Sequence, residues 1–254
     1  MDYLKRAHEL HEVIKQDRRT IHACPELGLE VPQTSAYIRK RLAEMGIESQ
    51  LCGKYGVTAL IGKKEDGPVL MLRADIDALP MNEESGLPFA SQNPGKAHCC
   101  GHDTHAAMLL GAAQMLKENE DALQGRIKLV FQPGEETGEG CQEMLANGVL
   151  ENPVPDAALG LHIDAGAPLC QVNWGKGPTF CSNDVFDIEV TGVSCHGARP
   201  HQGKDAINCA CHLVLNLEAL IAREADPSET DILTICSIES SDNVFNVFPT
   251  SVTL

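Results

Sequence analysis

The stretch HCCGHDTH at residues 98–105 places three histidines, two cysteines and an aspartate within eight positions. Cys100 and His102 are separated by one glycine, so both side chains can turn toward one ion if the backbone is extended or bent. A thiolate and an imidazole suit zinc and, less selectively, other divalent transition metals. The apolar run 106–116 predicts a buried helix, whose start favours anions. Taken alone, this stretch is also compatible with no metal site. The small buried residues would then be grouped by chance, and Asp103 would cap the helix.

The size and charge of the chain limit the classes of protein it can belong to. Its 254 residues are enough for one large domain or two small ones. A net charge of −16 argues against nucleic acid as a partner, because phosphate binding needs a basic surface. No apolar run approaches ~18 residues, so we expect no membrane-spanning segment. The first 19 residues are charged throughout, without the apolar core of a signal peptide, and predict a cytoplasmic protein.

The chain contains eleven cysteines at irregular spacing. They include no paired CxxC arrangement, and an odd number fits no closed disulfide framework. Most are therefore expected to be reduced and buried, with Cys209 and Cys211 in the core face of an apolar helix at 206–222.

Helical periodicity predicts helices at residues 2–19 and 34–45, and apolar runs predict strands at 57–61 and 69–72. The last of these runs into Asp75 and Asp77. Alternation along an extended chain would put both carboxylates on one side, beyond the carboxyl end of a strand, where α/β proteins gather their chemistry. A solvated strand end is the competing interpretation and is equally compatible with the sequence.

Two further strands end in groups that can bind a metal. The strand in residues 125–132 is followed by Glu135 and Glu136, which repel each other unless a cation lies between them or one takes up a proton. A metal site would resolve this, with one glutamate as ligand and the other as general base. The segment 156–162 predicts a strand ending in His162. An exposed acidic turn and a satisfied core histidine are the alternatives, but the recurrence at several strand ends favours a metal-dependent hydrolase.

The sequence resembles the metallopeptidase family of N-acyl-amino-acid amidohydrolases. That family includes aminoacylases, hippurate hydrolases, N-acetyldiaminopimelate deacetylases and plant auxin-conjugate hydrolases. The resemblance is carried, in order along the chain, by HACPEL at 22–27, RADIDALP at 73–80, CGHDTH at 100–105, QPGEE at 132–136 and GLH at 160–162.

The resemblance implies an α/β, zinc-peptidase-like catalytic domain with a mixed central sheet. It also implies zinc or manganese, as one or two ions, and a small N-acyl amino acid or peptide as substrate. The implied metal ligands are Cys100, His102, Glu136 and His162. Glu135 would be the general base, and Asp77 and Asp103 would support the site.

The second half of the chain predicts a separate α+β domain, with strands at 185–190 and 232–238 around the helix at 206–222. We place the boundary between residues 1–181 and 182–254. By resemblance this is an inserted lid or dimerisation domain. Its His196 would reach the active site of the neighbouring subunit and stabilise the oxyanion or the substrate carboxylate. Cys195 stands where family members usually carry glycine.

The chain stops inside the segment FNVFPTSVTL at 245–254. By resemblance the rest of the lid, the return to the catalytic domain and a last histidine ligand would follow, so we expect a truncated member of the family whose full-length form is a homodimer. The 254-residue chain alone is then expected to be poorly soluble and inactive. The alternative function is a non-catalytic metal-binding or dimerising fragment.

Overall fold

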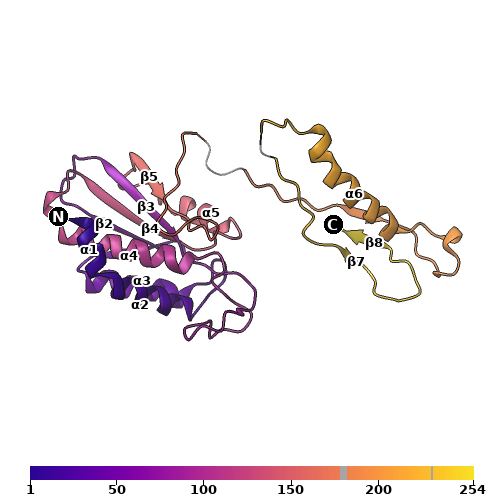
Figure 1. Cartoon of the computed structure of the whole chain (residues 1–254), viewed down its shortest axis with the longest axis horizontal. Coiled ribbons are helices and arrows are strands. Elements are labelled where there is room, and N and C mark those ends of the chain that lie inside the picture. Colours follow the sequence, from indigo (N-terminus) through magenta and orange to yellow (C-terminus); the bar gives the residue numbers. More distant parts are fainter. Residues whose placement is uncertain (178–181, 230) are drawn as a thin grey trace. The chain divides into compact units, whose positions relative to one another are not determined.

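The computed structural model describes residues 1–177, 182–229 and 231–254. These form two compact units, Met1–Ala167 and Pro168–Leu254, each of which is described by itself (Figure 1). The boundary expected between residues 181 and 182 falls next to the undescribed segment 178–181, and it stays a prediction.

The first unit contains helices on both faces of one sheet. Its helices are α1 (Tyr3–Glu9), α2 (His11–His22), α3 (Pro32–Glu44), α4 (His102–Glu118) and α5 (Glu139–Ala146), with a 3-10 turn at Glu120–Ala122. Its strands are β1 (Ser49–Cys52), β2 (Gly56–Ile61), β3 (Val69–Asp75), β4 (Arg126–Gln132) and β5 (Ala157–Gly160). The single helix expected over residues 2–19 is wrong, because the chain breaks at the buried Leu10 into α1 and α2.

The sheet of the first unit is mixed and has the strand order β1-β2-β4-β3-β5. β3 runs parallel to both β4 and β5, whereas β2 runs antiparallel to β1 and to β4. This arrangement confirms the expected α/β class with a mixed central sheet. Because parallel strands share a direction, the carboxyl ends of β3, β4 and β5 meet at one edge of the sheet.

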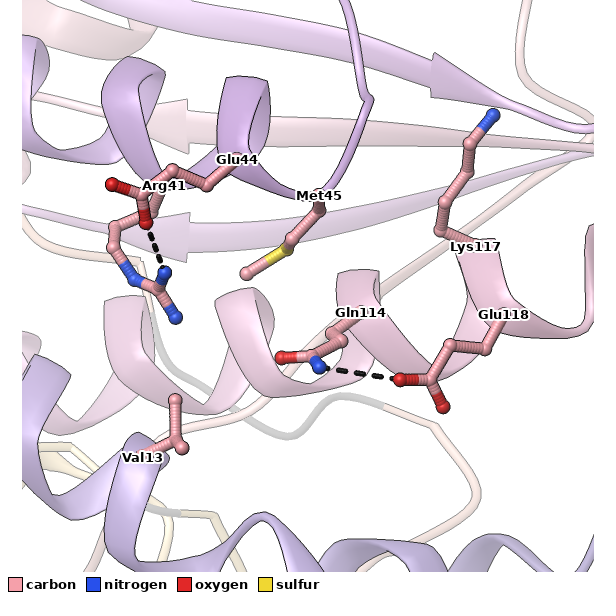
Figure 2. Close-up of a pocket in the computed structure, with 7 residues that line it drawn as sticks. All are labelled: Val13, Arg41, Glu44, Met45, Gln114, Lys117 and Glu118. Atoms are coloured by element: carbon pink, nitrogen blue, oxygen red, sulfur yellow. Dashed lines mark hydrogen bonds and ion pairs between the residues drawn. The ribbon is translucent and has the colours of Figure 1, made fainter.

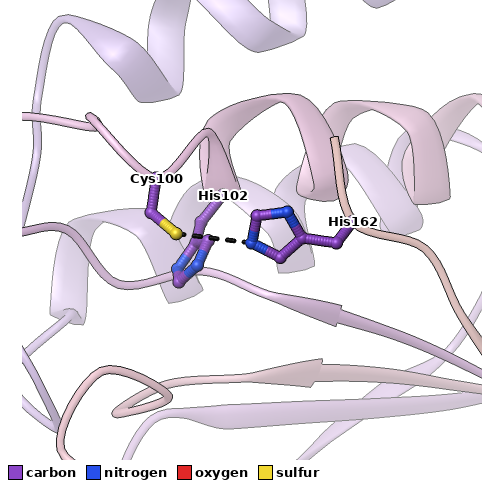
Figure 3. A group of neighbouring side chains, drawn as sticks. All are labelled: Cys100, His102 and His162. Atoms are coloured by element: carbon purple, nitrogen blue, oxygen red, sulfur yellow. Dashed lines mark hydrogen bonds between the residues drawn. The ribbon is translucent and has the colours of Figure 1, made fainter. Parts of the chain in front are cut away.

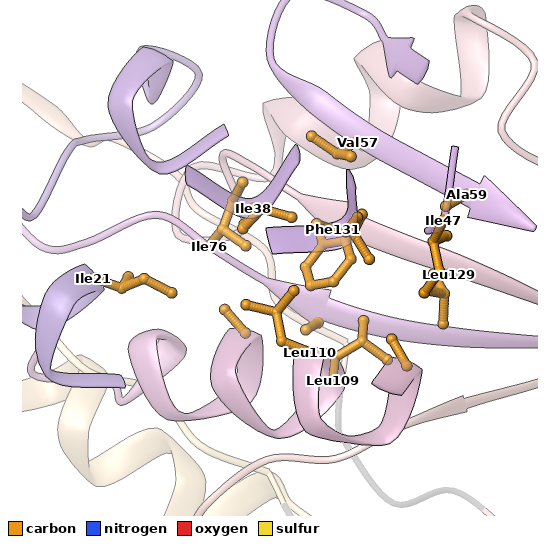
Figure 4. Packing of buried hydrophobic residues seen from close by; sticks show 14 of the residues in the cluster. Ile21, Ile38, Ile47, Val57, Ala59, Ile76, Leu109, Leu110, Leu129 and Phe131 are labelled. Carbon is orange, nitrogen blue, oxygen red and sulfur yellow. The ribbon is translucent and has the colours of Figure 1, made fainter. Parts of the chain in front are cut away.

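Strand β4 shows why the sheet can be covered on both faces. Leu129 and Phe131 point into the larger core, where they pack with α2, α3 and α4 (Figure 4). Val130 points the other way and packs with Met144 of α5 and with Cys52. Successive side chains of a strand alternate between faces, so one apolar strand serves two cores. The rigid layer that results carries the edge where β3, β4 and β5 end.

The second unit consists of a small antiparallel sheet and one long helix. Its elements are β6 (Glu189–Thr191), a 3-10 turn (Pro200–Gln202), α6 (Ala206–Glu224), β7 (Glu239–Ser240) and β8 (Ser251–Thr253), with the strand order β6-β8-β7. Ala206 and Ala210 of α6 form a core with Val252 and Leu254. The strand expected at 232–238 is wrong, because pairing with β8 begins only at Glu239. The strand expected at 185–190 is likewise reduced to β6, where pairing with β8 starts at Glu189.

Helix α6 departs from the expectation that its cysteines are buried. Cys209 and Cys211 are exposed instead of buried, and so are the apolar side chains of Ile207 and Leu215. In length and composition α6 is long and apolar enough to cross a membrane, but this does not overturn the expectation that the chain has no such segment, which stays a prediction. One helix of this kind is weak evidence for a membrane, since core helices of soluble proteins meet the same criterion.

Candidate metal centre

Gly101 forms the turn that leads into α4, at the edge where β3, β4 and β5 end. The helix begins at His102, four residues before the apolar run that predicted it. Gly101 has φ +83°, and a β-carbon there would lie 2.1 Å from Cδ1 of Ile163. Both the left-handed backbone and the close approach of Ile163 therefore require glycine.

Three side chains from this edge converge on one point. The ligand atoms of Cys100, His102 and His162 all lie within 4.8 Å of one another (Figure 3). The Cys100 Sγ is 3.3 Å from His162 Nε2. His162 Nδ1 lies 2.6 Å from the carbonyl oxygen of Ile163, which can only accept, so Nδ1 carries the hydrogen. The lone pair of Nε2 then faces Cys100, as a metal ligand requires.

A second group shares His102 with the first and contains the two adjacent glutamates. His102 Nε2 lies 3.8 Å from a carboxylate oxygen of Glu135 and 3.8 Å from one of Glu136. The Glu135 side chain is 40% exposed and that of Glu136 is 23% exposed. The two carboxylates therefore differ in their access to solvent.

Asp77 holds the turn that carries the two glutamates. Its carboxylate accepts hydrogen bonds from the backbone N–H groups of Glu135 (3.1 Å) and Glu136 (3.3 Å). Asp77 Oδ1 also lies 3.4 Å from Nδ1 of His102, and Asp75 Oδ2 lies 3.7 Å from Nε2 of the same ring. Both aspartates are buried, so the interpretation as a solvated strand end is wrong.

The donor set fits a divalent cation. His102 is fully buried, and neither ring nitrogen has a hydrogen-bond partner within the described ranges. Burial lowers the pKa of His102, but the carboxylates of Asp77, Asp75 and Glu136 outweigh it and raise the pKa overall. Burial and the negative charges of Glu136 and Glu135 raise the pKa of the Cys100 thiol to about 12. A cation among these groups would offset the repulsion of the carboxylates and favour the thiolate.

Asp103 contacts side chains of α2, and the supporting role expected for it at the site stays a prediction. Its carboxylate accepts from Arg18 Nε (2.6 Å) and lies 2.8 Å from His22 Nδ1, both on α2. Its side chain makes no capping hydrogen bond at the start of α4. His22 Nε2 in turn lies 3.1 Å from Glu83. The sequence analysis did not predict the contacts of Asp103 with Arg18 and His22. Two signals pointed to them: a buried acid next to His102 needs cationic partners, and His22 is the first residue of the motif HACPEL.

His196 belongs to the second unit, whereas the residues above belong to the first. Its ring is exposed, and its Nδ1 accepts a hydrogen bond from the backbone N–H of Ala198 (3.1 Å). The hydrogen of the neutral ring is therefore on Nε2, which is free to donate.

The hollow shown in Figure 2 has a volume of about 350 Å³ and lies among α2, α3 and α4. It is lined by Val13, Arg41, Glu44, Met45, Gln114, Lys117 and Glu118. None of the expected site residues lines it, so the candidate centre is at the sheet edge and not in this hollow.

Comparison with known families matches residues 71–238 to peptidase family M20/M25/M40. The match covers more than half of the chain and includes the carboxyl ends of β3, β4 and β5. The chain belongs to this family.

Individual relatives agree with the family assignment. N-acetyl-L-cysteine deacetylase of Bacillus subtilis is 42% identical over 93% of this chain, and IAA-amino acid hydrolase ILR1-like 4 of Arabidopsis thaliana is 41% identical over 93%. The crystal structure of the Bacillus subtilis YXEP protein, described as a dinuclear metal-binding peptidase of family M20, aligns with a TM-score of 0.71 and 32% identity. That alignment covers 97% of this chain and 63% of the YXEP chain. The chain spans 56% and 53% of the lengths of the two curated relatives.

Proposed function

We propose that the chain carries the metal centre of a divalent-metal-dependent amidohydrolase that cleaves the amide bond of N-acyl amino acids or small peptides. The observation that carries the proposal is the convergence of Cys100, His102 and His162 beside the Glu135–Glu136 pair. The names of the M20 relatives, a deacetylase of N-acetyl-L-cysteine and a hydrolase of IAA-amino acid, support an amide substrate of this class.

The proposed ligands are Cys100, His102, Glu136 and His162, which would hold zinc or manganese. A thiolate among the ligands favours zinc. The dinuclear metal binding of the related YXEP protein supports two ions as an alternative to one. When bound, the ion supplies Lewis-acid polarisation of the substrate carbonyl and lowers the pKa of water.

Glu135 is the proposed general base. It takes a proton from the attacking water and passes it to the leaving amine. Its greater exposure relative to Glu136 supports this division of roles, because the base must meet water and substrate. Asp77 supports both glutamates by accepting from their backbone N–H groups, which fixes the direction of the turn.

His196 is proposed to act on the active site of a second subunit, where its Nε2–H would donate to the oxyanion or to the substrate carboxylate. The observed hydrogen bond from Ala198 to Nδ1 supports a ring that presents a donor. In this proposal the full-length protein is a cytoplasmic homodimer, and residues 182–254 contribute to a lid or dimerisation domain.

Two substitutions at neighbouring positions test the roles of the glutamates. In an intact, active form of the protein, Glu135→Gln should bind zinc as the wild type does but lose roughly 10²–10⁴-fold in turnover of an N-acetyl amino acid. Glu136→Gln should instead lose zinc affinity. Zinc binding is measured by competition with a chromophoric chelator, and turnover by release of the free amine. Full turnover in zinc-loaded Glu135→Gln would refute the assignment of the base.

The same assay separates the enzyme from the alternative. Zinc bound with the expected ligand dependence, but without turnover of any N-acyl amino acid or dipeptide offered, would favour a non-catalytic metal-binding or dimerising fragment. Turnover that is abolished by a chelator and restored by zinc or manganese favours the amidohydrolase.

A further inference from the structure

His105 lies one turn after His102 on α4, is buried, and belongs to a third group of possible metal ligands with Asp75 and His102. Both of its ring nitrogens are already engaged. Nδ1 lies 2.5 Å from Asp75 Oδ1, and Nε2 lies 2.9 Å from the backbone nitrogen of Ile163. A backbone N–H can only donate, so Nε2 must accept and the hydrogen must be on Nδ1, where the carboxylate of Asp75 receives it. His105 therefore has a fixed tautomer and no lone pair left for an ion.

Asp75 is itself held in place. Its second oxygen accepts from Arg73 Nη1 at 2.7 Å, and Arg73 Nε donates to the side-chain oxygen of Gln132 at 3.0 Å. Arg73 and Asp75 belong to β3, and Gln132 is the last residue of β4. The hydrogen-bonded chain thus starts on the rigid central strands and ends on the backbone at residue 163.

The segment that carries His162 has few other anchors. It follows β5, which is at the edge of the sheet and whose four residues are all exposed. Leu161 is 52% exposed, so packing does not hold the segment. By contrast, Ile163 makes three contacts with the centre. Its N–H donates to His105, its carbonyl accepts from His162 Nδ1, and its side chain covers Gly101.

We propose that Asp75 and His105 form a positioning pair that fixes the His162 segment against α4, so that His162 Nε2 meets Cys100 and His102. The pair contributes no ligand of its own. This inference rests on the proposed function, because it assumes that His162 binds the ion.

The test compares two substitutions at one position. In His105→Gln the side-chain oxygen takes the place of Nε2 and still accepts from the N–H of Ile163. In His105→Phe a phenyl ring replaces the imidazole ring, so an aromatic ring still fills the space but both hydrogen bonds are lost. We expect His105→Phe to bind Co²⁺ about 10–100-fold more weakly than the wild type, as is typical when a group supporting a ligand is removed. Its cobalt absorption spectrum should match that of His162→Ala, whereas His105→Gln should keep the wild-type spectrum. Circular dichroism shows that each variant is folded.

Two results would overturn the inference. One is wild-type cobalt affinity and spectrum in His105→Phe. The other is equal loss in His105→Gln and His105→Phe with a spectrum unlike that of His162→Ala, which would make His105 a ligand.

Hydrogen exchange of the Ile163 amide, measured by NMR without metal, separates this inference from the proposed function. Protection in the wild type and in His105→Gln, with loss in His105→Phe, supports the positioning pair even if the wild type binds no ion. Unchanged exchange in His105→Phe would contradict the pair, whatever the metal does.

Discussion

Single residues decide the geometry of the proposed metal centre, and Gly101 does so most directly. It separates Cys100 from His102, adopts a left-handed backbone and leaves no room for a β-carbon beside Ile163. The glycine therefore has two separable effects, one on backbone energy and one on the position of the His162 segment.

Gly101→Ala tests both effects. We expect a loss of roughly 1–3 kcal/mol in the free energy of unfolding from the backbone conformation, together with weaker zinc binding because Ile163 must move. Gly46→Ala is the matched control, since Gly46 has φ +71° but nothing within 4 Å of the added β-carbon. It should lose stability without losing zinc affinity. Equal zinc affinity in both variants would argue against the contact with Ile163.

The sequence pointed to the residues proposed to carry chemistry and to Asp77 as a support, but not to the side chains that hold Asp103. Glu135, Glu136 and His162 were visible because each follows an apolar strand, and strand ends are where an α/β protein exposes polar groups. The partners of Asp103 were not, because Arg18 and His22 lie about 80 positions earlier and approach it only when α2 packs on α4. The roles of the strand-end residues stay predictions.

At the scale of elements, polar contacts as well as apolar packing fix how α2 and α3 meet. Asp17 of α2 is buried and accepts from Arg41 Nε (2.7 Å) and from the hydroxyl of Tyr37 (2.6 Å), both on α3. Burial and the hydrogen bond to Asp17 raise the pKa of Tyr37 to about 12. The folded state therefore favours the neutral phenol.

Tyr37→Phe should cost about 1 kcal/mol in the free energy of unfolding near pH 8, the typical value of one hydrogen bond. Above pH 10 the unfolded wild type loses the phenolic proton while the folded state keeps it, so wild-type stability declines as pH rises from 10 to 12. Tyr37→Phe has no phenol at this position, so its stability lacks this pH dependence. The difference in the free energy of unfolding between the wild type and the variant should therefore shrink as pH rises. Urea titrations at pH 8, 10 and 11 measure it, and a constant difference would contradict the raised pKa.

Elements that depend on a distant partner were predicted least well. β3 and β4 were expected because long apolar runs form central strands. The run 232–238 predicted a strand in the same way, but it pairs with no strand in the described part of the chain. Ile232 in this run is 81% exposed. Strand formation depends on pairing and burial as much as on composition, so sequence pattern alone does not predict it.

For the whole molecule, the proposal requires the two units to act together across a dimer. All four proposed ligands and the proposed base lie in Met1–Ala167, whereas His196 lies in Pro168–Leu254. In this proposal a second copy brings its His196 to the ligands and the base of the first.

Mixed dimers of the full-length protein test this arrangement. A His196→Ala subunit and a Glu135→Gln subunit are each expected to be inactive as homodimers. In the mixed dimer one site combines an intact Glu135 with an intact His196 from the other subunit, so part of the activity should return. Absence of activity in a mixed dimer verified by mass spectrometry would contradict action across subunits.

The central claim is that Cys100, His102, Glu136 and His162 bind one ion at the edge where β3, β4 and β5 end. The most direct measurement is an anomalous difference map, recorded at the zinc absorption edge, from crystals grown with zinc. We predict a peak at roughly 2.0–2.3 Å from Cys100 Sγ, a carboxylate oxygen of Glu136 and the Nε2 atoms of His102 and His162. A peak bound between Asp75 and His105, or no peak within bonding distance of Cys100, would contradict it.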